Sequence, residues 1–225
     1  MKLATLTSGG KDSLYALFLA KKAGHEIKYL ATIISKNPES FMWHTINIGL
    51  TVLQSRVLGI PLVSKSSAGQ KEKEIEDLRL LLKDLDIEGV ACGGISSEYQ
   101  KERIKKVCKE LKLKLIAPLW GKPPEQLLKD MLAEQFEIII TAVAAEGFDS
   151  SWLGRKINEK CIADLIELNK KYGINISAEG GEYETLVLDC PLFRKKIKIL
   201  KTEKIWDKKT QSGQLIIKDT KLVEK

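Results

Sequence analysis

The chain has 225 residues, and its 37 Lys and Arg residues against 30 Asp and Glu residues give a formal charge of +7. A hydrophobic fraction of 44% is ordinary for a folded protein and excludes a disordered chain. The longest apolar runs, such as Leu14–Ala20 and Ile138–Ala145, are much shorter than the ~20 residues that cross a bilayer. The first residues form a strand-like run without the features of a secretory signal, so we expect a cytoplasmic protein without membrane contact.

The placement of cysteines and charges excludes several classes of site. Four cysteines lie far apart in the chain, at Cys92, Cys108, Cys161 and Cys190, with no C-x-x-C pair. This spacing favours reduced, mostly buried thiols over a zinc, iron–sulfur or dithiol redox centre. Many lysines alternate with glutamates, which is typical of solvated helix faces. The positive charge therefore permits an acidic partner without establishing one.

The first half of the chain alternates strand-like and helix-like segments. Short apolar runs predict five strands, at Lys2–Thr7, Ile27–Ile34, Pro61–Val63, Gly89–Cys92 and Leu113–Ala117. Amphipathic runs between them predict four helices, at Asp12–Gly24, His44–Leu58, Glu72–Leu85 and Glu98–Leu111. Strands that alternate with helices predict an α/β fold with a doubly wound, mainly parallel five-stranded sheet.

The pattern changes at Trp120–Pro124, which has the composition of a linker and could also open the next helix. Beyond it, we expect helices at Glu125–Ala133 and Asn158–Tyr172, a strand-like run at Phe136–Ala145 and an apolar run at Leu186–Leu188. Two alternating stretches, Lys196–Lys201 and Gln214–Lys218, predict half-exposed antiparallel strands. We therefore expect two domains, residues 1–120 and a smaller α+β domain of residues 121–225.

The segment between the first strand and the first helix, Ser8-Gly9-Gly10-Lys11-Asp12-Ser13, has the properties of an anion site. Its two glycines allow a tight turn and a close approach of the backbone to a ligand. The N–H groups that begin a helix lack intrahelical partners and carry the positive end of the helix dipole. Two hydroxyls and the Lys11 ammonium add donors. A glycine turn capped by Asp12 would explain neither Lys11 nor the two serines, so we predict a phosphate-binding loop.

This loop differs from the two common nucleotide motifs. A Walker A loop has Ser or Thr directly after its Lys, where this chain has Asp12, and the spacing of the glycines does not fit G-x-G-x-x-G. Ser8–Ser13 instead resembles the pyrophosphate loop (PP-loop) of the N-type ATP pyrophosphatases, relatives of GMP synthetase, asparagine synthetase and the tRNA sulfur-transfer enzymes. The resemblance implies an adenine nucleotide alpha hydrolase-like, Rossmann-like fold. It also implies that ATP is cleaved between its α- and β-phosphates, with Mg²⁺ accompanying it.

The same resemblance assigns roles to individual residues. It implies that ATP is bound by Ser8, Gly9, Gly10, Lys11, Asp12 and Ser13. Of these, Lys11, Asp12 and Ser13 would also take part in catalysis. The adenine would lie at the end of the second strand, near Ala31 and Ile33. Residues 1–120 would then be the ATP-binding domain, whereas the sequence does not identify ligands for a metal.

A second unusual run, Glu179-Gly180-Gly181-Glu182-Tyr183-Glu184-Thr185, lies in the second half of the chain. Its carboxylates repel one another unless a cation or hydrogen-bond donors lie between them. If the chain is extended after the glycine pair, Glu182 and Glu184 lie on one face of the strand. Tyr183 and Thr185 then lie on the other. The alternative is an acidic hairpin on the surface, but that interpretation does not explain why glutamates flank the glycine pair.

Together with the phosphate loop, this run resembles the diphthine–ammonia ligase family. The resemblance covers most of the chain and depends on the order of four motifs: Ser8–Ser13, Tyr99-Gln100 after Gly93-Gly94, Ala117-Pro118-Leu119-Trp120, and Glu179–Asp189 continuing into Pro191-Leu192-Phe193. Each middle motif is weak alone, whereas their order and spacing are specific. Two positions depart from the family pattern, because the family often has Asp where Gly94 stands and Gly where Ala178 stands.

The family resemblance implies an ATP-dependent, AMP-forming carboxylate–ammonia ligase. Such an enzyme adenylates the carboxylate of diphthine, a modified histidine on translation elongation factor 2, and amidates it to give diphthamide, AMP and pyrophosphate. Met1 is not a Cys and the chain has no Cys–His glutaminase module, so free ammonia, supplied as ammonium, is the simplest nitrogen donor. The implied partner is elongation factor 2 carrying diphthine. A nucleic-acid partner is not expected, and a homo-oligomer is compatible with the sequence.

The resemblance places substrate binding on Glu179, Gly180, Gly181, Glu182, Tyr183, Glu184 and Thr185 of the smaller domain, with Tyr99 and Gln100 of the first. Diphthine carries a quaternary ammonium, which aromatic faces favour by ~0.5–2 kcal/mol per contact. We hypothesise that this cation is bound by Glu182, Glu184, Tyr183 and Trp120. Alternatively, the glutamates hold ammonium or magnesium.

Two further groups have alternative interpretations. Tyr99, Gln100 and Arg103 fall at a helix start, where they either line the same cleft or form an ordinary helix surface. His44 lies beside Trp43 in an irregular segment, and we favour a structural or nucleotide-contact role over a catalytic base. Adenylation of a carboxylate needs no base to ionise the nucleophile.

Two other functions fit parts of the sequence. A tRNA-modifying ATP pyrophosphatase with a PP-loop would suit the basic charge, but the chain lacks the paired or catalytic cysteines of a sulfur-transfer enzyme. A non-catalytic ATP-binding protein would need the phosphate loop but has little reason to carry the acidic second motif. The products separate these alternatives, since only the ligase forms AMP and pyrophosphate in response to diphthine.

Overall fold

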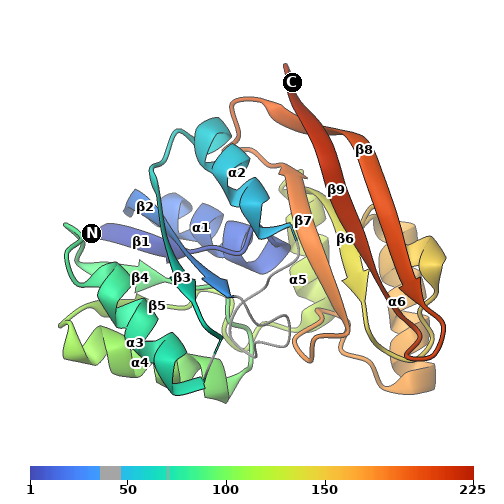
Figure 1. The fold of residues 1–225 in the computed structure, drawn as a ribbon, viewed down its shortest axis with the longest axis horizontal. Coiled ribbons are helices and arrows are strands. Elements are labelled where there is room, and N and C mark those ends of the chain that lie inside the picture. Colours follow the sequence, from blue (N-terminus) through green and yellow to red (C-terminus); the bar gives the residue numbers. More distant parts are fainter. Residues whose placement is uncertain (36–46, 70) are drawn as a thin grey trace. The chain divides into compact units, whose positions relative to one another are not determined.

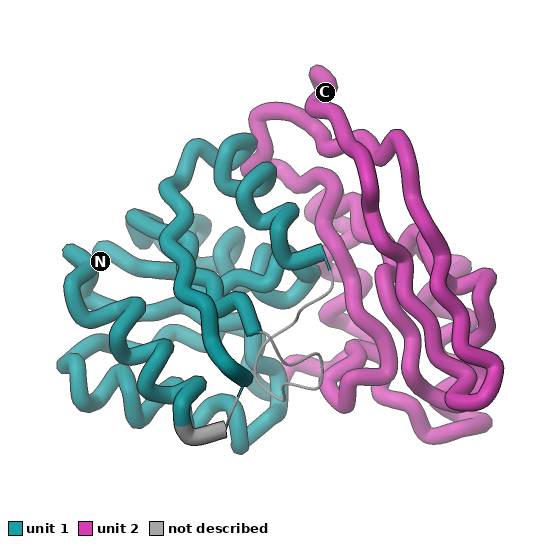
Figure 2. The backbone as a smooth tube through the Cα atoms, in the orientation of Figure 1, with its two compact units in different colours: residues 1–121 teal, residues 122–225 magenta. Residues whose placement is uncertain are grey.

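The computed structural model describes residues 1–35, 47–69 and 71–225, and Figure 1 traces their fold. The chain divides into two compact units, which Figure 2 distinguishes by colour. Unit 1 is Met1–Gly121 and unit 2 is Lys122–Lys225.

Unit 1 is built on a five-stranded parallel sheet with the strand order β3-β2-β1-β4-β5. Its strands are β1 (Lys2–Leu6), β2 (Glu26–Ser35), β3 (Leu62–Ser67), β4 (Gly89–Ala91) and β5 (Lys114–Ile116). The predicted doubly wound sheet is therefore confirmed. The order reverses between β1 and β4, and ligands bind at the carboxyl ends of strands beside such a switch point.

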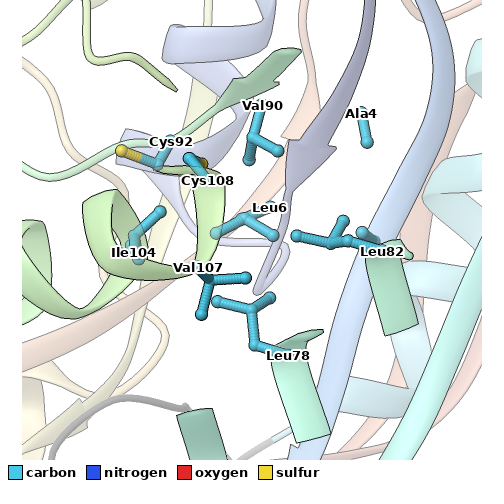
Figure 3. Close-up of a cluster of buried hydrophobic side chains, with 10 residues drawn as sticks. Ala4, Leu6, Leu78, Leu82, Val90, Cys92, Ile104, Val107 and Cys108 are labelled. Atoms are coloured by element: carbon cyan, nitrogen blue, oxygen red, sulfur yellow. The ribbon is translucent and has the colours of Figure 1, made fainter. Parts of the chain in front are cut away.

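Helices cover both faces of this sheet because the direction of strand order reverses after β3, and right-handed crossovers then pass over the opposite face. The helices are α1 (Lys11–Lys22), α2 (Thr51–Leu58), α3 (Lys71–Leu82) and α4 (Glu98–Glu110), with a short 3-10 helix, η1 (Ile48–Leu50). On one face, Ala4 and Leu6 of β1 pack with Leu78 of α3 and Val107 of α4 (Figure 3). On the other face, Leu3 packs with Ala20 of α1. Alternate residues of β1 thus anchor helices on opposite sides of the sheet.

Unit 2 contains an antiparallel sheet with the strand order β7-β6-β9-β8. Its elements are α5 (Pro124–Ala133), β6 (Glu137–Val143), the 3-10 helix η2 (Ser150–Trp152), α6 (Glu159–Tyr172), β7 (Tyr183–Asp189), β8 (Lys196–Asp207) and β9 (Ser212–Val223). Pro124 begins α5, where its missing N–H costs nothing, and the Asn158 side chain caps α6 by accepting from the Cys161 N–H at 2.9 Å. The expected α+β composition of this half is confirmed.

Several predicted boundaries are wrong. The helix predicted over His44–Leu58 is, in the described residues, η1 followed by α2, whereas Trp43 and His44 lie outside the described residues. The two tail strands are twelve residues each, because their outer parts are exposed and polar and so lack the apolar alternation that marks a strand. Among the helices of the described ranges, none is long and apolar enough to cross a membrane.

Candidate functional site

The predicted phosphate loop connects β1 to α1 beside the switch point of the sheet. Gly10 is the N-cap of α1, with extended φ and ψ of −80° and 169°, and Lys11 is the first helical residue. Gly9 has φ +83°, a left-handed conformation that a residue with a Cβ atom rarely adopts. The glycine pair therefore turns the chain sharply from strand to helix, and the N-terminus of α1 is left at the carboxyl edge of the sheet.

Hydroxyl groups hold the loop in shape. The Gly9 N–H donates to Thr7 Oγ1 at 3.2 Å, and the Gly10 N–H donates to Ser8 Oγ at 3.4 Å. Ser13 Oγ donates to the Gly10 carbonyl at 3.0 Å and lies 3.4 Å from the Ser8 N–H. Ser8 and Ser13, which the sequence identifies as phosphate donors, thus also brace the backbone that would surround the anion.

Lys11 and Asp12 form an ion pair within the loop. The Lys11 side chain is only 3% exposed, and its Nζ lies 2.8 Å from Asp12 Oδ2, whose side chain is 29% exposed. A buried ammonium needs such a counter-charge, because removing an unpaired charge from water is costly. The pair holds the Lys11 charge at the loop.

Three residues that the sequence analysis did not assign to the phosphate loop hold it in place. A Cβ atom on Gly93 would lie 2.5 Å from the Asp12 carbonyl carbon, so the turn after β4 packs directly against the first turn of α1. Gln54 Nε2 donates to the Gly9 carbonyl at 2.9 Å, and Thr32 Oγ1 donates to the Thr7 carbonyl at 2.8 Å. Neighbouring strands and helices therefore fix the loop on both sides.

A sequence signal existed for two of these residues. Gly93 follows an apolar run and precedes a second glycine, which marks a turn at a strand end. Gln54 occupies a position of α2 that shares its buried face with Val57 and Leu58, and a polar side chain at a buried helical position usually has a specific partner. Thr32 lies inside a buried strand and carries no comparable signal.

The two residues predicted near the adenine lie inside the sheet. Ala31 pairs with Leu6 of β1, and its carbonyl accepts from the Thr7 N–H at 2.9 Å, which places it level with the loop. Ile33 pairs with Lys65 of β3, and its side chain is 2% exposed. β2 continues to Ser35, so these two positions contribute backbone and packing beside the loop rather than a free strand end.

Aromatic and cationic side chains gather at the start of α4 and the turn after β5. Arg103 Cζ lies 3.6 Å from the centroid of the Tyr99 ring, and Lys101 Nζ lies 3.4 Å from the centroid of the Trp120 ring. The Gln100 N–H donates to the Ser97 Oγ, which caps the helix. Tyr99 is 37% exposed. Both rings thus have a cation against them, the arrangement that a quaternary ammonium would seek.

The turn after β4 is joined to this aromatic cluster. The Gly121 N–H donates to the Ile95 carbonyl at 2.9 Å, which ties the end of the Trp120 turn to the segment that begins at Gly93. Because Gly93 also touches Asp12, the phosphate loop and the aromatic cluster lie along one edge of the same sheet.

In the second motif, Glu182 is held by backbone donors. One carboxylate oxygen accepts from the Asn175 N–H at 2.7 Å and the other accepts from the Gly180 N–H at 2.9 Å. Gly181 has φ +83° and completes a tight turn directly before β7. The carboxylates of this run require either a cation or hydrogen-bond donors between them. For Glu182, the backbone of the loop supplies donors.

Tyr183 lies inside unit 2. Its ring is 3% exposed and lies 6.1 Å from the Phe148 ring, and its hydroxyl donates to the Ile176 carbonyl at 2.6 Å. Glu184 and Thr185 follow it on β7, half-buried and paired with β6, and Glu179 is half-buried in the preceding turn. Tyr183 is therefore placed as a support for the loop.

Ala178, one of the two departures from the family pattern, has φ +62°. This left-handed conformation costs a residue with a Cβ atom roughly 1–2 kcal/mol, whereas glycine adopts it freely. The position therefore keeps the backbone of a glycine while carrying an alanine. At Gly94, the other departure, nothing lies within 4 Å of an added Cβ atom.

The cysteines take no part in these sites. All four fall within the described ranges, none forms a disulfide and each is buried, as predicted. Burial raises the pKa of Cys108 to about 12 and that of Cys161 and Cys190 to about 11. Thiols with such pKa values are poor nucleophiles at neutral pH, which disfavours sulfur transfer.

The described residues contain no group of three or more His, Cys, Asp or Glu side chains placed to hold a metal ion. Mg²⁺ that accompanies a nucleotide needs only one or two carboxylates, because phosphate oxygens and waters complete its shell. Asp12 is the carboxylate of the phosphate loop, so the residues present fit a nucleotide-bound Mg²⁺ and not a preformed protein cage.

Comparison with known proteins adds the family. The diphthamide synthase N-terminal domain matches residues 1–115, and the diphthamide synthase C-terminal domain matches residues 123–223. The diphthine–ammonia ligase of Rattus norvegicus is 39% identical in an alignment that covers 91% of this chain and 85% of that protein. The diphthine–ammonia ligase of Homo sapiens is 37% identical in an alignment that covers 88% of this chain and 82% of that protein.

Among solved structures, a predicted subunit of tRNA methyltransferase from Methanocaldococcus jannaschii is 17% identical with a TM-score of 0.46, covering 85% of this chain and 98% of that one. This similarity is too low to support any assignment. The family assignment rests on the two domain matches and on the relatives above 30% identity, whose alignments cover most of both chains. This protein belongs to the diphthamide synthase family.

Proposed function

We propose that this protein is a diphthine–ammonia ligase. It adenylates the carboxylate of diphthine on translation elongation factor 2 with ATP and amidates it with ammonia, and the products are diphthamide, AMP and pyrophosphate. One observation carries the proposal. This protein belongs to the diphthamide synthase family and has a glycine loop at the switch point of its sheet, with the buried Lys11 at the start of the helix that follows.

The first step joins the substrate to AMP. A diphthine carboxylate oxygen attacks the α-phosphorus of ATP, the bond from that phosphorus to the bridging oxygen breaks, and pyrophosphate leaves. The N-terminus of α1 and Lys11 stabilise the negative charge that develops on the leaving group. Lys11 would exchange Asp12 for the phosphates, and Asp12 would be the residue to hold Mg²⁺, which would supply further charge neutralisation when bound.

The second step forms the amide. Ammonia attacks the carbonyl carbon of the acyl adenylate, AMP leaves, and the nitrogen loses a proton to solvent. No thiol or covalent enzyme intermediate is required, in agreement with the buried cysteines.

The second motif has a revised role in the proposal. Glu182 and Tyr183 position the loop of residues 175–182, because both are engaged with its backbone. Unit 2 then provides the substrate-binding surface, and unit 1 provides the ATP site. A translation factor as substrate places the reaction in the cytoplasm.

Trp120 is the aromatic residue best suited to the quaternary ammonium of diphthine. Lys101 already rests on its ring, which supports the proposal that a cation binds there. Diphthine would replace the Lys101 ammonium, with Tyr99 and Gln100 at the same helix start. Trp120→Ala should then raise the KM for the diphthine-bearing factor about tenfold while leaving the KM for ATP unchanged, since one cation–π contact is worth about 1–2 kcal/mol in a desolvated site.

The decisive experiment incubates the protein with ATP, ammonium and elongation factor 2 that carries diphthine. Intact mass should reveal replacement of the carboxyl OH by NH₂, and chromatography should detect AMP in equal amount. Factor that lacks diphthine is the control.

Other outcomes identify the alternatives. AMP formation that depends on tRNA would indicate a tRNA-modifying enzyme, and binding of ATP with no turnover would indicate a non-catalytic ATP-binding protein. Formation of ADP and phosphate would refute the assignment of the phosphate loop.

A further inference from the structure

The positive charge of the protein is concentrated at one place in the chain. Residues 194–225 contain eleven Lys and Arg residues and four Asp and Glu residues, a formal charge of +7. Residues 1–193 contain twenty-six of each sign and are neutral. The whole excess therefore belongs to β8, β9 and their flanking residues, which we call the basic ribbon.

The basic ribbon is a two-stranded structure over most of its length. β9 pairs with β8 at eleven positions but with β6 at only two, Gln214 and Gly213. The neighbouring edge of β6 is taken by another segment, since the Ile140 N–H donates to the Arg155 carbonyl and the Ile157 N–H donates to the Ile138 carbonyl. β8 forms the outer edge of the sheet in unit 2 (Figure 1).

Several charges of the ribbon form no close ion pair within the fold. Lys198, Lys201, Lys208, Lys209 and Lys221 are exposed, and none has an acidic side chain within 4.0 Å in the described part of the chain. Of these, Lys201 faces Asp219 across the two strands. Lys198 and Lys221 stand directly opposite each other in the register of β8 and β9. Like charges in this position destabilise a sheet, so folding alone does not account for them.

Protection of a sheet edge is the ordinary explanation for lysines on an outer strand. It fits Lys198 and Lys201 on β8, but not Lys221 on the inner strand or the pair at the hairpin turn, Lys208 and Lys209. The same edge also carries half-exposed Leu200 and Ile205, which would invite the pairing that lysines are meant to prevent.

The mixture of side chains favours a protein over a nucleic acid as the partner. Leu200, Ile205 and Leu222 are three of the six large apolar side chains that are exposed in the described residues. Protein interfaces combine an apolar centre with charged surroundings, whereas nucleic-acid interfaces are more polar and more uniformly basic. Glu203 and Asp219 on the ribbon would repel phosphates. The ribbon also has only one Arg, the residue that binds phosphates and bases in a bidentate manner.

We infer that the basic ribbon is the docking surface for an acidic face of the protein substrate. This inference rests on the proposed function for the identity of the partner, but not on the chemistry at the phosphate loop. Leu200 and Ile205 provide the apolar contact, and the unpaired lysines accelerate encounter and select an acidic partner. The ribbon thereby recruits the whole translation factor, while the diphthine side chain enters the active site.

The test measures equilibrium binding to elongation factor 2 in the absence of ATP, at low and at physiological ionic strength. The ribbon variant K198Q/K201Q/K221Q should bind about tenfold more weakly than the unmodified protein at low salt and should lose most of the salt dependence. The control variant K106Q/K114Q/K160Q removes the same charge from exposed lysines elsewhere and should bind within about twofold of the unmodified protein. Both variants should bind ATP normally.

The outcomes are distinct. Equal weakening of the ribbon and control variants would overturn the inference, because net charge alone would then explain it. Absence of binding by the unmodified protein would also overturn it, as would normal factor binding by a ribbon variant that loses only a mixed-sequence RNA probe. Ribbon-dependent binding without amide formation would support the docking surface and refute the proposed reaction, so the two can fail separately.

Discussion

The two glycine motifs of this protein share a glycine pair and have different structures. Ser8–Ser13 is followed by a helix, and its glycine pair leaves the helix N-terminus at the edge of a parallel sheet. Glu179–Thr185 leads into a strand that begins at Tyr183, and the first glycine of its pair donates its N–H to the Glu182 carboxylate, as Asn175 does. We propose that the first motif receives an anion, whereas the second contains its own.

The difference teaches that the element after a glycine pair decides what the pair does. A helix start concentrates N–H donors without intrahelical partners, and a buried lysine adds to their field. At the start of β7 there is no such row of N–H groups. The two N–H groups of the preceding turn, from Asn175 and Gly180, donate to Glu182, which thereby holds the turn. Substitutions in the two motifs should therefore fail in different ways, the first in catalysis and the second in stability.

Lys11→Ala should produce the largest effect. Loss of one electrostatic stabiliser of the leaving group should lower turnover by about 10²–10³-fold, measured as AMP formed with saturating ATP. Lys21→Ala, at the exposed far end of the same helix, is the matched control and should leave the rate unchanged. A normal rate in the Lys11 variant would mean that the loop does not hold pyrophosphate.

Gly93→Ala should have the next largest effect, because its Cβ atom would lie 2.5 Å from the backbone of Asp12. We expect a loss of about 1–3 kcal/mol in stability from overpacking, with a weakened affinity for ATP as the loop shifts. Gly94→Ala is the control, since the space there is open, and should change stability by less than about 0.5 kcal/mol. Thermal unfolding and ATP titration measure the two effects, and equal behaviour of both variants would contradict the contact.

Glu182→Gln tests the second motif. The amide keeps the size of the side chain but presents an NH₂ group to one of two backbone donors, so unfolding should become easier by about 1–2 kcal/mol. The KM for ATP should not change. Glu167→Gln, in an exposed pair with Lys170, is the control and should have almost no effect. An unchanged stability together with a raised KM for the protein substrate would instead mean that Glu182 contacts the substrate.

Ala178→Gly should have the smallest effect and the opposite sign. Relief of the left-handed strain at φ +62° should stabilise the protein by up to about 1 kcal/mol, after the greater entropy of glycine in the unfolded state is deducted. Ala163→Gly, on the exposed face of α6, should destabilise by about 0.5–1 kcal/mol. If thermal unfolding shows that Ala178→Gly is destabilised as Ala163→Gly is, the prediction is contradicted and the turn carries no strain.

The sequence by itself determined the class of the first half. Short apolar runs and amphipathic segments predicted a mainly parallel sheet of five strands with helices between them. The loop Ser8–Ser13 stood out because its glycines, lysine and hydroxyl residues lie within six consecutive positions. The order of motifs was enough to identify the family that the comparisons confirm. These features depend on residues close together in the chain, which is why a linear pattern reveals them.

Only the tertiary structure decided the rest, because it depends on residues that are distant in sequence. Gly93 matters through the backbone of Asp12, and Gln54 matters through the carbonyl of Gly9. The hydrogen-bond partners of Glu182 depend on the conformation of its turn. The cross-strand pair of Lys198 and Lys221 depends on the register of β8 and β9. No local sequence pattern predicts either one. A polar edge strand has no buried face to impose periodicity, so the length of the basic ribbon emerged only once its strands were paired.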